Sequence, residues 1–179
     1  MYRFRLSFGT LADRGAARAP AQTKTKASPV GTKRVLASAN PALIELAQNP
    51  ERRGIGRQAD GRLLTAVVDD DPAVRNSLTR LLSALDYRTE AFGSAEEFLV
   101  AAPTAKPACI VVDINLGDTS GLELVRELSA RGFRFPVIFI SGVDDGIIQR
   151  QASELGCIAF LRKPFPADQL VQALKVATG

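Results

Sequence analysis

Short apolar runs alternate with amphipathic segments from residue 63 to the last residue of the sequence. Five runs have the length and apolar character of buried strands, and they cover residues 63–68, 87–92, 109–112, 136–140 and 157–161. Each run is followed by a segment with apolar residues at helical spacing, such as Leu78, Leu82 and Leu85 after the first run. Strands that alternate with helices pair in parallel, because each helix carries the chain back across the sheet. The sequence therefore predicts an α/β fold of five βα units, with a five-stranded parallel sheet and helices on both of its faces.

Residue types at the boundaries of these segments support the helices. Asp71 can accept hydrogen bonds as an N-cap, and Pro72 can occupy the first helical position. Ser94 and Glu97 have the spacing of a capping box, and Gly132 follows the end of a helical pattern. We therefore expect helices to begin at Pro72 and just after Ser94, and one helix to end before Gly132.

The sequence before these units has a different composition. Residues 1–63 hold 12 of the 23 Lys and Arg but only 4 of the 19 Asp and Glu, whereas residues 64–179 are net acidic. Because the first segment shows little sustained apolar periodicity, we expect a basic, mostly disordered N-terminal extension, 1–63, before one folded domain, 64–179. A strand-like alternation at 2–8 and a short helical pattern from Asn40 are the exceptions.

A basic extension of this kind has several interpretations. It could be a nucleic-acid-binding arm or a targeting peptide, or else a solvated tail or sequence upstream of the true start. Its aromatic residues are not interleaved with the later Lys and Arg, as stacking on bases would need. We therefore favour the solvated tail or upstream sequence and do not expect nucleic acid as a partner.

Missing residue types and patterns exclude several classes of protein. The sequence contains no histidine, which removes the commonest general base, the Ser/His and Cys/His nucleophile pairs and most zinc sites. No window approaches the roughly 18 uninterrupted apolar residues of a membrane span. Cys109 and Cys157 lie in apolar runs without ligand-like neighbours, which indicates buried thiols in a reducing compartment. We expect a cytoplasmic protein with no membrane partner.

Polar residues of unusual type lie at the ends of four predicted strands. Asp69 and Asp70 end the first, Asp113 the third, Ser141 the fourth and Lys163 the fifth. Ligands of open α/β sheets bind beyond the carboxyl ends of the strands, and in the flavodoxin-like order 2-1-3-4-5 the first and third strands are neighbours. Three carboxylates would then share one crevice and repel one another unless a cation neutralises them. A hard, oxygen-rich site suits Mg²⁺, which is the cofactor we expect.

These groups together suit the transfer of a phosphoryl group onto an aspartate. A carboxylate attacks, while Mg²⁺ and Lys163 stabilise the oxygens that gain negative charge. Taken singly each signal is weak, since an acidic run before a proline is usually a helix cap and Ser141 alone would be a turn residue. Their shared position along one edge of the predicted sheet favours the functional interpretation.

Four segments within residues 64–179 together match one known family. They are residues 67–72 (VVDDDP), 111–116 (VVDINL, with Gly121 beyond it), 139–142 (FISG) and 160–165 (FLRKPF). This part of the chain resembles the receiver domain of two-component response regulators. The resemblance implies a signalling domain rather than an enzyme, phosphorylated by a sensor histidine kinase or a phosphotransfer protein. Gly117 departs from the family pattern, which often has proline there, and this leaves the shape of the loop after Asp113 open.

The resemblance also implies a role for each residue at the acidic cluster. Asp113 would accept the phosphoryl group and contribute to the metal site. Asp70 would bind Mg²⁺ directly and Asp69 through water, with Asn115 giving its main-chain carbonyl. Asp71, which follows the acidic pair, would be a helix cap.

Three further residues carry over from the family on the opposite side of the site. Ser141 would be the switch hydroxyl that turns toward the phosphoryl group, and Phe160 the aromatic residue that follows it inward. Plain core packing is the alternative for Phe160. Lys163 would be the ammonium partner, before a cis peptide bond to Pro164.

Three functional hypotheses remain open from the sequence. The first is a stand-alone receiver whose phosphorylation changes its contact with an unidentified downstream protein, with a homodimer possible. The second is the receiver part of a DNA-binding transcription regulator, in which the output domain is missing or the basic tail binds DNA. The third is a phosphatase with an Asp-x-Asp nucleophile motif at Asp69 and Asp71, which leaves Asp113 unexplained.

Overall fold

The computed structural model describes residues 61–179 of the chain. The expected disordered extension, with the patterns at 2–8 and from Asn40, lies outside the described residues apart from its last three positions. Of those, Leu63 joins the sheet, since its carbonyl accepts a hydrogen bond of 3.0 Å from the backbone N–H of Arg88. Within the described part of the chain, no helix is long and apolar enough to cross a membrane.

The described residues form five large strands, a small two-stranded ladder and five helices. In chain order the elements are β1 Leu64–Val68, α3 Pro72–Ala84, β2 Arg88–Phe92, α4 Ala95–Ala105, β3 Cys109–Asp113, β4 Asn115–Leu116, β5 Thr119–Ser120, α5 Gly121–Ala130, β6 Val137–Ser141, α6 Gly146–Glu154, β7 Ala159–Arg162 and α7 Ala167–Thr178.

The large strands form one parallel sheet, which confirms the prediction from the alternating pattern. Its order is β2-β1-β3-β6-β7, which is 2-1-3-4-5 when only these five strands are counted. All four pairings are parallel, and β3 is paired on one edge with β1 and on the other with β6. The sheet is therefore doubly wound, and the strand order reverses between β1 and β3.

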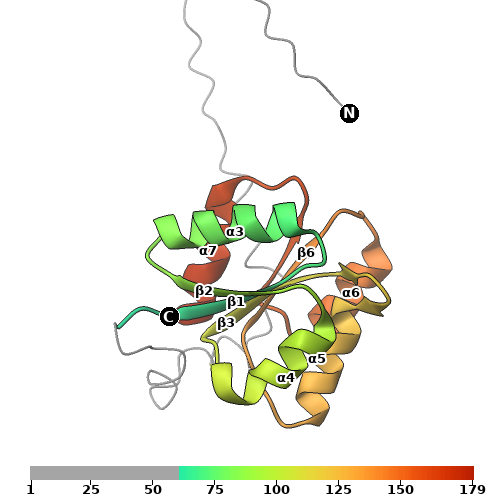
Figure 1. Ribbon diagram of the computed structural model, residues 1–179. Coiled ribbons are helices and arrows are strands. Elements are labelled where there is room, and N and C mark those ends of the chain that lie inside the picture. Colours follow the sequence, from blue (N-terminus) through green and yellow to red (C-terminus); the bar gives the residue numbers. More distant parts are fainter. Residues whose placement is uncertain (1–60) are drawn as a thin grey trace, which may run out of the picture.

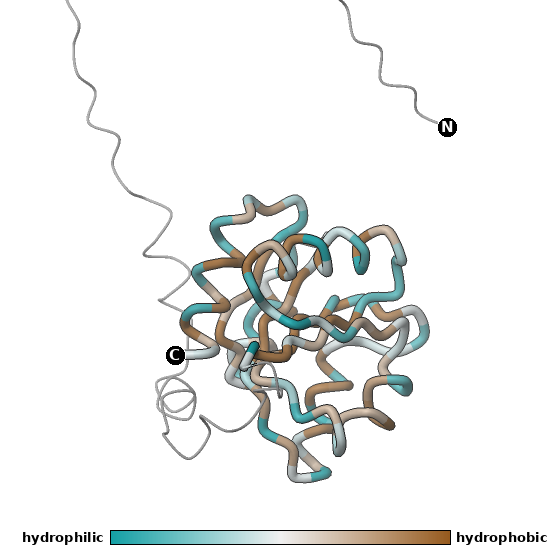
Figure 2. The backbone as a smooth tube through the Cα atoms, turned by 60° about the vertical axis from the view of Figure 1, so that its left-hand side comes forward, coloured by the Kyte–Doolittle hydropathy of each residue, from teal (hydrophilic) through white to brown (hydrophobic). Residues whose placement is uncertain are grey.

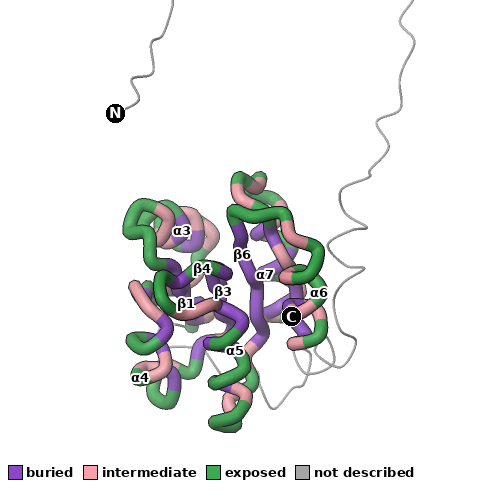
Figure 3. The backbone as a smooth tube through the Cα atoms, turned by 90° about the vertical axis from the view of Figure 1, so that its right-hand side faces the viewer, coloured by how far each residue is buried: buried purple, intermediate pink, exposed green. Residues whose placement is uncertain are grey.

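Helices cover both faces of this sheet (Figure 1). On one face α3 and α7 enclose a core that includes Leu78, Leu82, Leu170 and Leu174. On the other face α4, α5 and α6 pack over a second core with Phe98 at its centre. Apolar stretches run through the interior of the domain (Figure 2), and the central strands are buried while the outer sides of the helices are exposed (Figure 3). The strands β1, β3 and β6 are buried along their whole length, which explains why their sequences read as continuous apolar runs.

The helix boundaries agree with the expected caps at one position and only in part at another. Asp71 caps α3 by accepting a hydrogen bond of 2.8 Å from the backbone N–H of Ala73, with Pro72 as the first helical residue. Ser94 caps α4, but the reciprocal half of the expected capping box is absent. The carboxylate of Glu97 accepts from the backbone N–H of Gly93, at 2.6 Å, and not from that of Ser94. The carboxylate of Glu97 thus accepts a hydrogen bond from the turn that connects β2 to α4.

The loop after Asp113 forms a small hairpin that the sequence pattern did not predict. Strands β4 and β5 pair antiparallel, with Gly117 and the residue after it as the two-residue turn. Gly117 has a φ of +70°, a conformation that proline cannot adopt. The turn therefore favours glycine at this position and excludes proline, and the hairpin gives the loop a defined shape. Beyond the hairpin, Ser120 and Glu123 form the complete capping box of α5.

Candidate functional site

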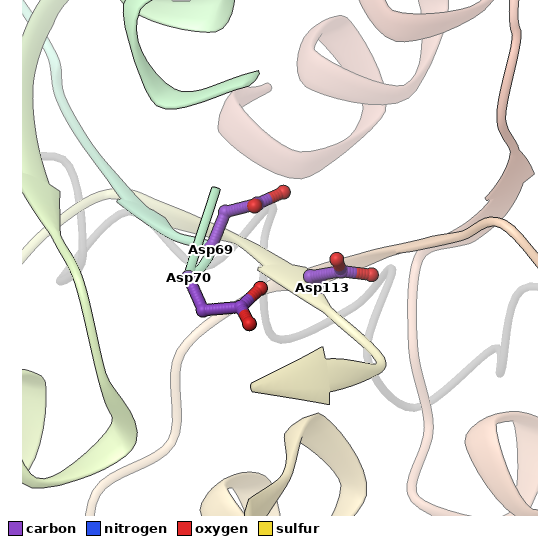
Figure 4. A group of neighbouring side chains, drawn as sticks. All are labelled: Asp69, Asp70 and Asp113. Atoms are coloured by element: carbon purple, nitrogen blue, oxygen red, sulfur yellow. The ribbon is translucent and has the colours of Figure 1, made fainter. Parts of the chain in front are cut away.

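Three aspartates meet at the carboxyl end of the sheet, where the strand order reverses. Asp69 and Asp70 directly follow β1, and Asp113 is the last residue of β3, the strand paired with β1. Figure 4 shows the three side chains grouped over this edge, and a carboxylate oxygen from each lies within 4.8 Å of those of the others. Asp69 is completely buried and Asp113 is 7% exposed, whereas Asp70 is exposed. The cluster therefore opens to solvent on the side of Asp70.

Lys163 reaches this cluster from the far strand of the sheet. It follows β7, and its backbone N–H donates to the carbonyl of Ser141 at 2.7 Å, which fixes the start of its loop. Its Nζ lies 2.8 Å from Oδ2 of Asp69 and 2.9 Å from Oδ2 of Asp113. The peptide bond from Lys163 to Pro164 is cis. One ammonium thus bridges two carboxylates that come from neighbouring strands.

The surroundings shift the pKa values of two of these groups. Burial raises the pKa of Asp113 above its ordinary value, and the hydrogen bond and charge of Lys163 oppose this shift only in part. Burial alone would lower the pKa of Lys163. Its hydrogen bonds to Asp69 and Asp113 outweigh burial and hold the pKa of the ammonium above its ordinary value. Lys163 is therefore charged at neutral pH.

The charges of the cluster leave room for a further cation. Three carboxylates face one ammonium, and Oδ1 of Asp113 is buried without a hydrogen-bond partner among the described residues. A buried, unpartnered carboxylate oxygen is costly unless something else binds it. An all-oxygen donor set of this size, open to water, fits a divalent cation such as Mg²⁺. Asn115, expected to add a main-chain carbonyl, lies next to the cluster as the first residue of β4.

The two residues expected to act as switches lie on neighbouring strands. Ser141 ends β6 and is completely buried. Its hydroxyl donates to the carbonyl of Val143 and accepts from the N–H of the same residue, both at 3.1 Å. Phe160, in β7, is partly buried and packs against the core under α4, α5 and α6. In this arrangement the hydroxyl of Ser141 is engaged by its own loop.

Two residues near the acidic cluster have contacts that no sequence pattern indicated. Nη1 of Arg75, in α3, donates a hydrogen bond of 2.6 Å to the main-chain carbonyl of Asp69. Gly121 packs so closely against the backbone of Asp113 that a Cβ added there would overlap its carbonyl oxygen. Gly121 is among the residues that resemble the receiver family, so the sequence marked it as important. The close contact with Asp113 that explains its importance is visible only in the structure. For Arg75, which lies six residues after Asp69, no sequence pattern indicated a contact.

The described residues thus form a doubly wound α/β domain with an acidic, lysine-bridged site at the switch point of its sheet. The chain belongs to the response regulator receiver domain family, whose model matches residues 65–175. The resemblance of residues 64–179 to that family is thereby confirmed.

Relatives and solved structures agree with this assignment. The chain is 40% identical over 111 residues to the transcriptional regulatory protein TdiR of Thauera aromatica, which covers 62% of this chain and 49% of TdiR. It is 39% identical to the transcriptional regulatory protein FixJ of Azorhizobium caulinodans, covering 63% of this chain and 54% of FixJ. The crystal structure of FixJ-N superposes with a TM-score of 0.61 at 32% identity, over 65% of this chain and 93% of that one. The chain spans about half the length of these two relatives.

Proposed function

We propose that this receiver domain accepts a phosphoryl group on Asp113. The observation that carries the proposal is the state of this carboxylate. Lys163 holds one of its oxygens, while the other, buried at the open end of β3, has no partner in the described part of the chain. Burial raises the pKa of Asp113, and a more basic carboxylate is the stronger nucleophile. Lys163 stays charged beside it and can stabilise phosphoryl oxygens that gain negative charge.

The same cluster would hold Mg²⁺ through Asp70 and Asp113, with Asp69 contributing through water and Asn115 through its main-chain carbonyl. When bound, the ion supplies positive charge that stabilises the transferring phosphoryl group. Asp69 also orients the site, because its carboxylate binds Lys163 through Oδ2 and the N–H of Asp71 through Oδ1, at 2.9 Å. Asp71 itself serves as the cap of α3.

The phosphoryl donor is a separate protein. A carboxylate oxygen of Asp113 forms the new P–O bond as the P–N bond of a phosphohistidine breaks, and the electron pair returns to the imidazole. Residues 1–179 contain no histidine, and the receiver family implies a sensor histidine kinase or a phosphotransfer protein as the donor. The domain is a signalling module rather than an enzyme that turns over substrate.

Phosphorylation is read through Ser141 and Phe160. The hydroxyl of Ser141 would leave Val143 and turn toward the phosphoryl group, and Phe160 would follow toward the space that it vacates. This rearrangement would alter the surface formed by α6 and β7. The output is then a phosphorylation-dependent contact with a downstream protein or with a second copy of the chain.

A second candidate is the receiver part of a DNA-binding transcription regulator. It is favoured by the names of TdiR and FixJ, both transcriptional regulatory proteins that are about twice as long as the stretch they share with this chain. In the version that uses the basic residues 1–63, binding to DNA would weaken steeply as salt rises. Binding unaffected by deletion of those residues would remove that version.

We place the extension at 1–63, the receiver at 64–179 and the protein in the cytoplasm.

The phosphoacceptor assignment is tested by locating the modified residue. The full chain is incubated with acetyl phosphate and Mg²⁺, reduced with borohydride, which converts an aspartyl phosphate to homoserine, and mapped by peptide mass spectrometry. Homoserine at position 113, absent from Asp113→Asn, is the expected result. Homoserine at another aspartate would show that the assignment is wrong. Hydrolysis of p-nitrophenyl phosphate that is lost in Asp69→Asn but kept in Asp113→Asn would favour the phosphatase instead.

A further inference from the structure

Arg75 occupies a position that helix electrostatics do not favour. It lies in the first turn of α3, which begins at Pro72, and no acidic residue accompanies it in that turn. The amino end of a helix carries partial positive charge, so a cation there is unfavourable. The side chain is nevertheless partly buried and makes a short hydrogen bond, 2.6 Å, to the main-chain oxygen of Asp69. A contact outside the helix accounts for its position.

The oxygen that Arg75 binds lies just beyond the last strand pairing. Val68 is the last residue of β1 in register with β2, and the N–H of Asp69 still donates to the carbonyl of Phe92 at 3.2 Å. Strand β2 ends at Phe92, so no further residue of β2 pairs with Asp69. The guanidinium therefore takes the place of a strand partner for the carbonyl of Asp69.

This carbonyl belongs to the peptide group that joins Asp69 to Asp70. Asp69 is held at its side chain by Lys163 and Asp71, but no described residue hydrogen bonds to the carboxylate of Asp70. The direction of the Asp70 side chain therefore depends on the backbone from which it projects. Fixing the plane of the preceding peptide restricts that direction.

We propose that Arg75 is a positioning residue of the divalent-cation site, which orients Asp70 by holding the peptide group between Asp69 and Asp70. The proposal rests on the proposed function, in that it takes Asp69, Asp70 and Asp113 as the cation site. Arg75 touches neither the cation nor the phosphoryl group, and it acts through the backbone.

The guanidinium of Arg75 lies beside Gly93, in the turn after β2. A Cβ built on Gly93 would lie 3.6 Å from Nη1 of Arg75 and 3.5 Å from Oε2 of Glu97. The cationic and the anionic group thus gather over the same glycine. A Cβ at position 93 would make only ordinary van der Waals contacts with these two groups.

Positioning and simple charge effects predict opposite results. Arg75 carries positive charge close to a site for a cation, so its removal would tighten cation binding if only Coulomb repulsion mattered. If Arg75 orients Asp70, its removal weakens cation binding even though the local charge becomes more negative. The sign of the change therefore separates the two explanations.

The test measures the binding of Mn²⁺ alone, which prefers the same oxygen ligands as Mg²⁺, by the loss of the free-ion EPR signal. The proteins are the full-length wild type, Arg75→Met, Arg75→Lys and the matched control Arg80→Met, an exposed arginine on the same helix. We expect Arg75→Met to raise the Kd for Mn²⁺ about tenfold, the effect of one charge-assisted hydrogen bond. Arg75→Lys keeps a hydrogen-bond donor, so its Kd for Mn²⁺ should lie between those of Arg75→Met and wild type. Arg80→Met should leave the Kd unchanged or lower it.

Circular dichroism at the assay temperature establishes that each variant is folded, and Arg75→Gln replaces Arg75→Met if the latter does not fold. The Mg²⁺ dependence of modification by acetyl phosphate gives a second readout. The Mg²⁺ concentration for half-maximal rate should rise, while the rate at saturating Mg²⁺ stays near that of wild type. An Arg75→Met Kd equal to or below that of wild type would overturn the positioning role. Absence of Mn²⁺ binding to the wild type, or its persistence in Asp113→Asn, would instead overturn the proposed metal site.

Discussion

Lys163 binds Asp113 through one carboxylate oxygen only: its Nζ lies 2.9 Å from Oδ2, while Oδ1 is buried and without a partner among residues 61–179. The same ammonium is shared with Asp69, at 2.8 Å. One positive charge therefore serves two buried carboxylates, and a third, that of Asp70, lies nearby. Buried charge of this kind is tolerated for function at a cost in stability.

Replacement of Asp113 with asparagine should stabilise the domain in the absence of divalent cations. Burial raises the pKa of Asp113. A carboxyl whose pKa is higher in the folded state than in the unfolded state binds its proton more tightly when folded, so its ionised form destabilises the fold at neutral pH. Asp113→Asn removes this effect, and we expect its thermal midpoint to exceed that of wild type by several degrees.

The difference should shrink as the pH is lowered through the folded-state pKa of Asp113, because protonated aspartic acid resembles asparagine in charge. This difference in thermal midpoint is measured by monitoring the thermal unfolding of both proteins with circular dichroism, over a series of pH values and in the presence of chelator. A difference that grows on acidification would contradict the raised pKa.

Replacement of Lys163 with methionine should have the opposite effect on stability. It leaves Asp69, which is completely buried, without its counter-charge. Loss of one partner from a buried pair costs about 3 kcal/mol. Urea unfolding should show this loss, and added Mg²⁺ should recover part of it. Lys175→Met, an exposed lysine in α7, is the matched control and should change the unfolding free energy by less than about 0.5 kcal/mol. Equal effects of the two substitutions would contradict the account.

Replacement of Gly121 with alanine should displace the backbone that carries Asp113. The added Cβ would overlap the carbonyl oxygen of Asp113 and lie 2.8 Å from Cγ1 of Val112. We expect a loss of about 2 kcal/mol or more in unfolding free energy, as for other overpacked positions. Gly146→Ala, at the start of α6, meets no atom within 4 Å and is the control. Similar unfolding free energies for the two alanine variants in urea would contradict the close packing of Gly121 against Asp113.

Both cysteines should be unreactive while the domain is folded. Cys109 and Cys157 are free thiols, 0% and 1% exposed, and they belong to the cores on opposite faces of the sheet. Burial raises the pKa of Cys157 to about 11 and that of Cys109 further still. Iodoacetamide at mildly alkaline pH should therefore label neither in the native protein and both in denaturant, as counted by intact mass. Rapid labelling of the native protein would contradict this burial.

The strand order and the position of the acidic cluster were predictable from the sequence. Strands such as 109–113 are apolar throughout because both faces are covered, and the alternation with helices leaves few topologies. Once β1 and β3 are neighbours, Asp69, Asp70 and Asp113 must meet. Given that order, the prediction needed only which residue ends each strand, and this is a local property.

Contacts that depend on side-chain direction were not predictable in the same way. The hairpin after Asp113 has strands too short to show periodicity. Glu97 could satisfy either of two neighbouring N–H groups, and spacing alone did not decide between them. The bond from Arg75 to Asp69 joins a helix to the end of a strand, so it requires the angle between these elements as well as their order.

Intact-mass spectrometry of the full chain shows directly whether Asp113 accepts a phosphoryl group. Wild type and Asp113→Asn are incubated with acetyl phosphate, each with Mg²⁺ and with chelator. We expect one phosphoryl adduct on the wild type that requires Mg²⁺, and none on Asp113→Asn. An adduct of equal yield on Asp113→Asn, or no adduct on folded wild type with Mg²⁺ present, would contradict this expectation.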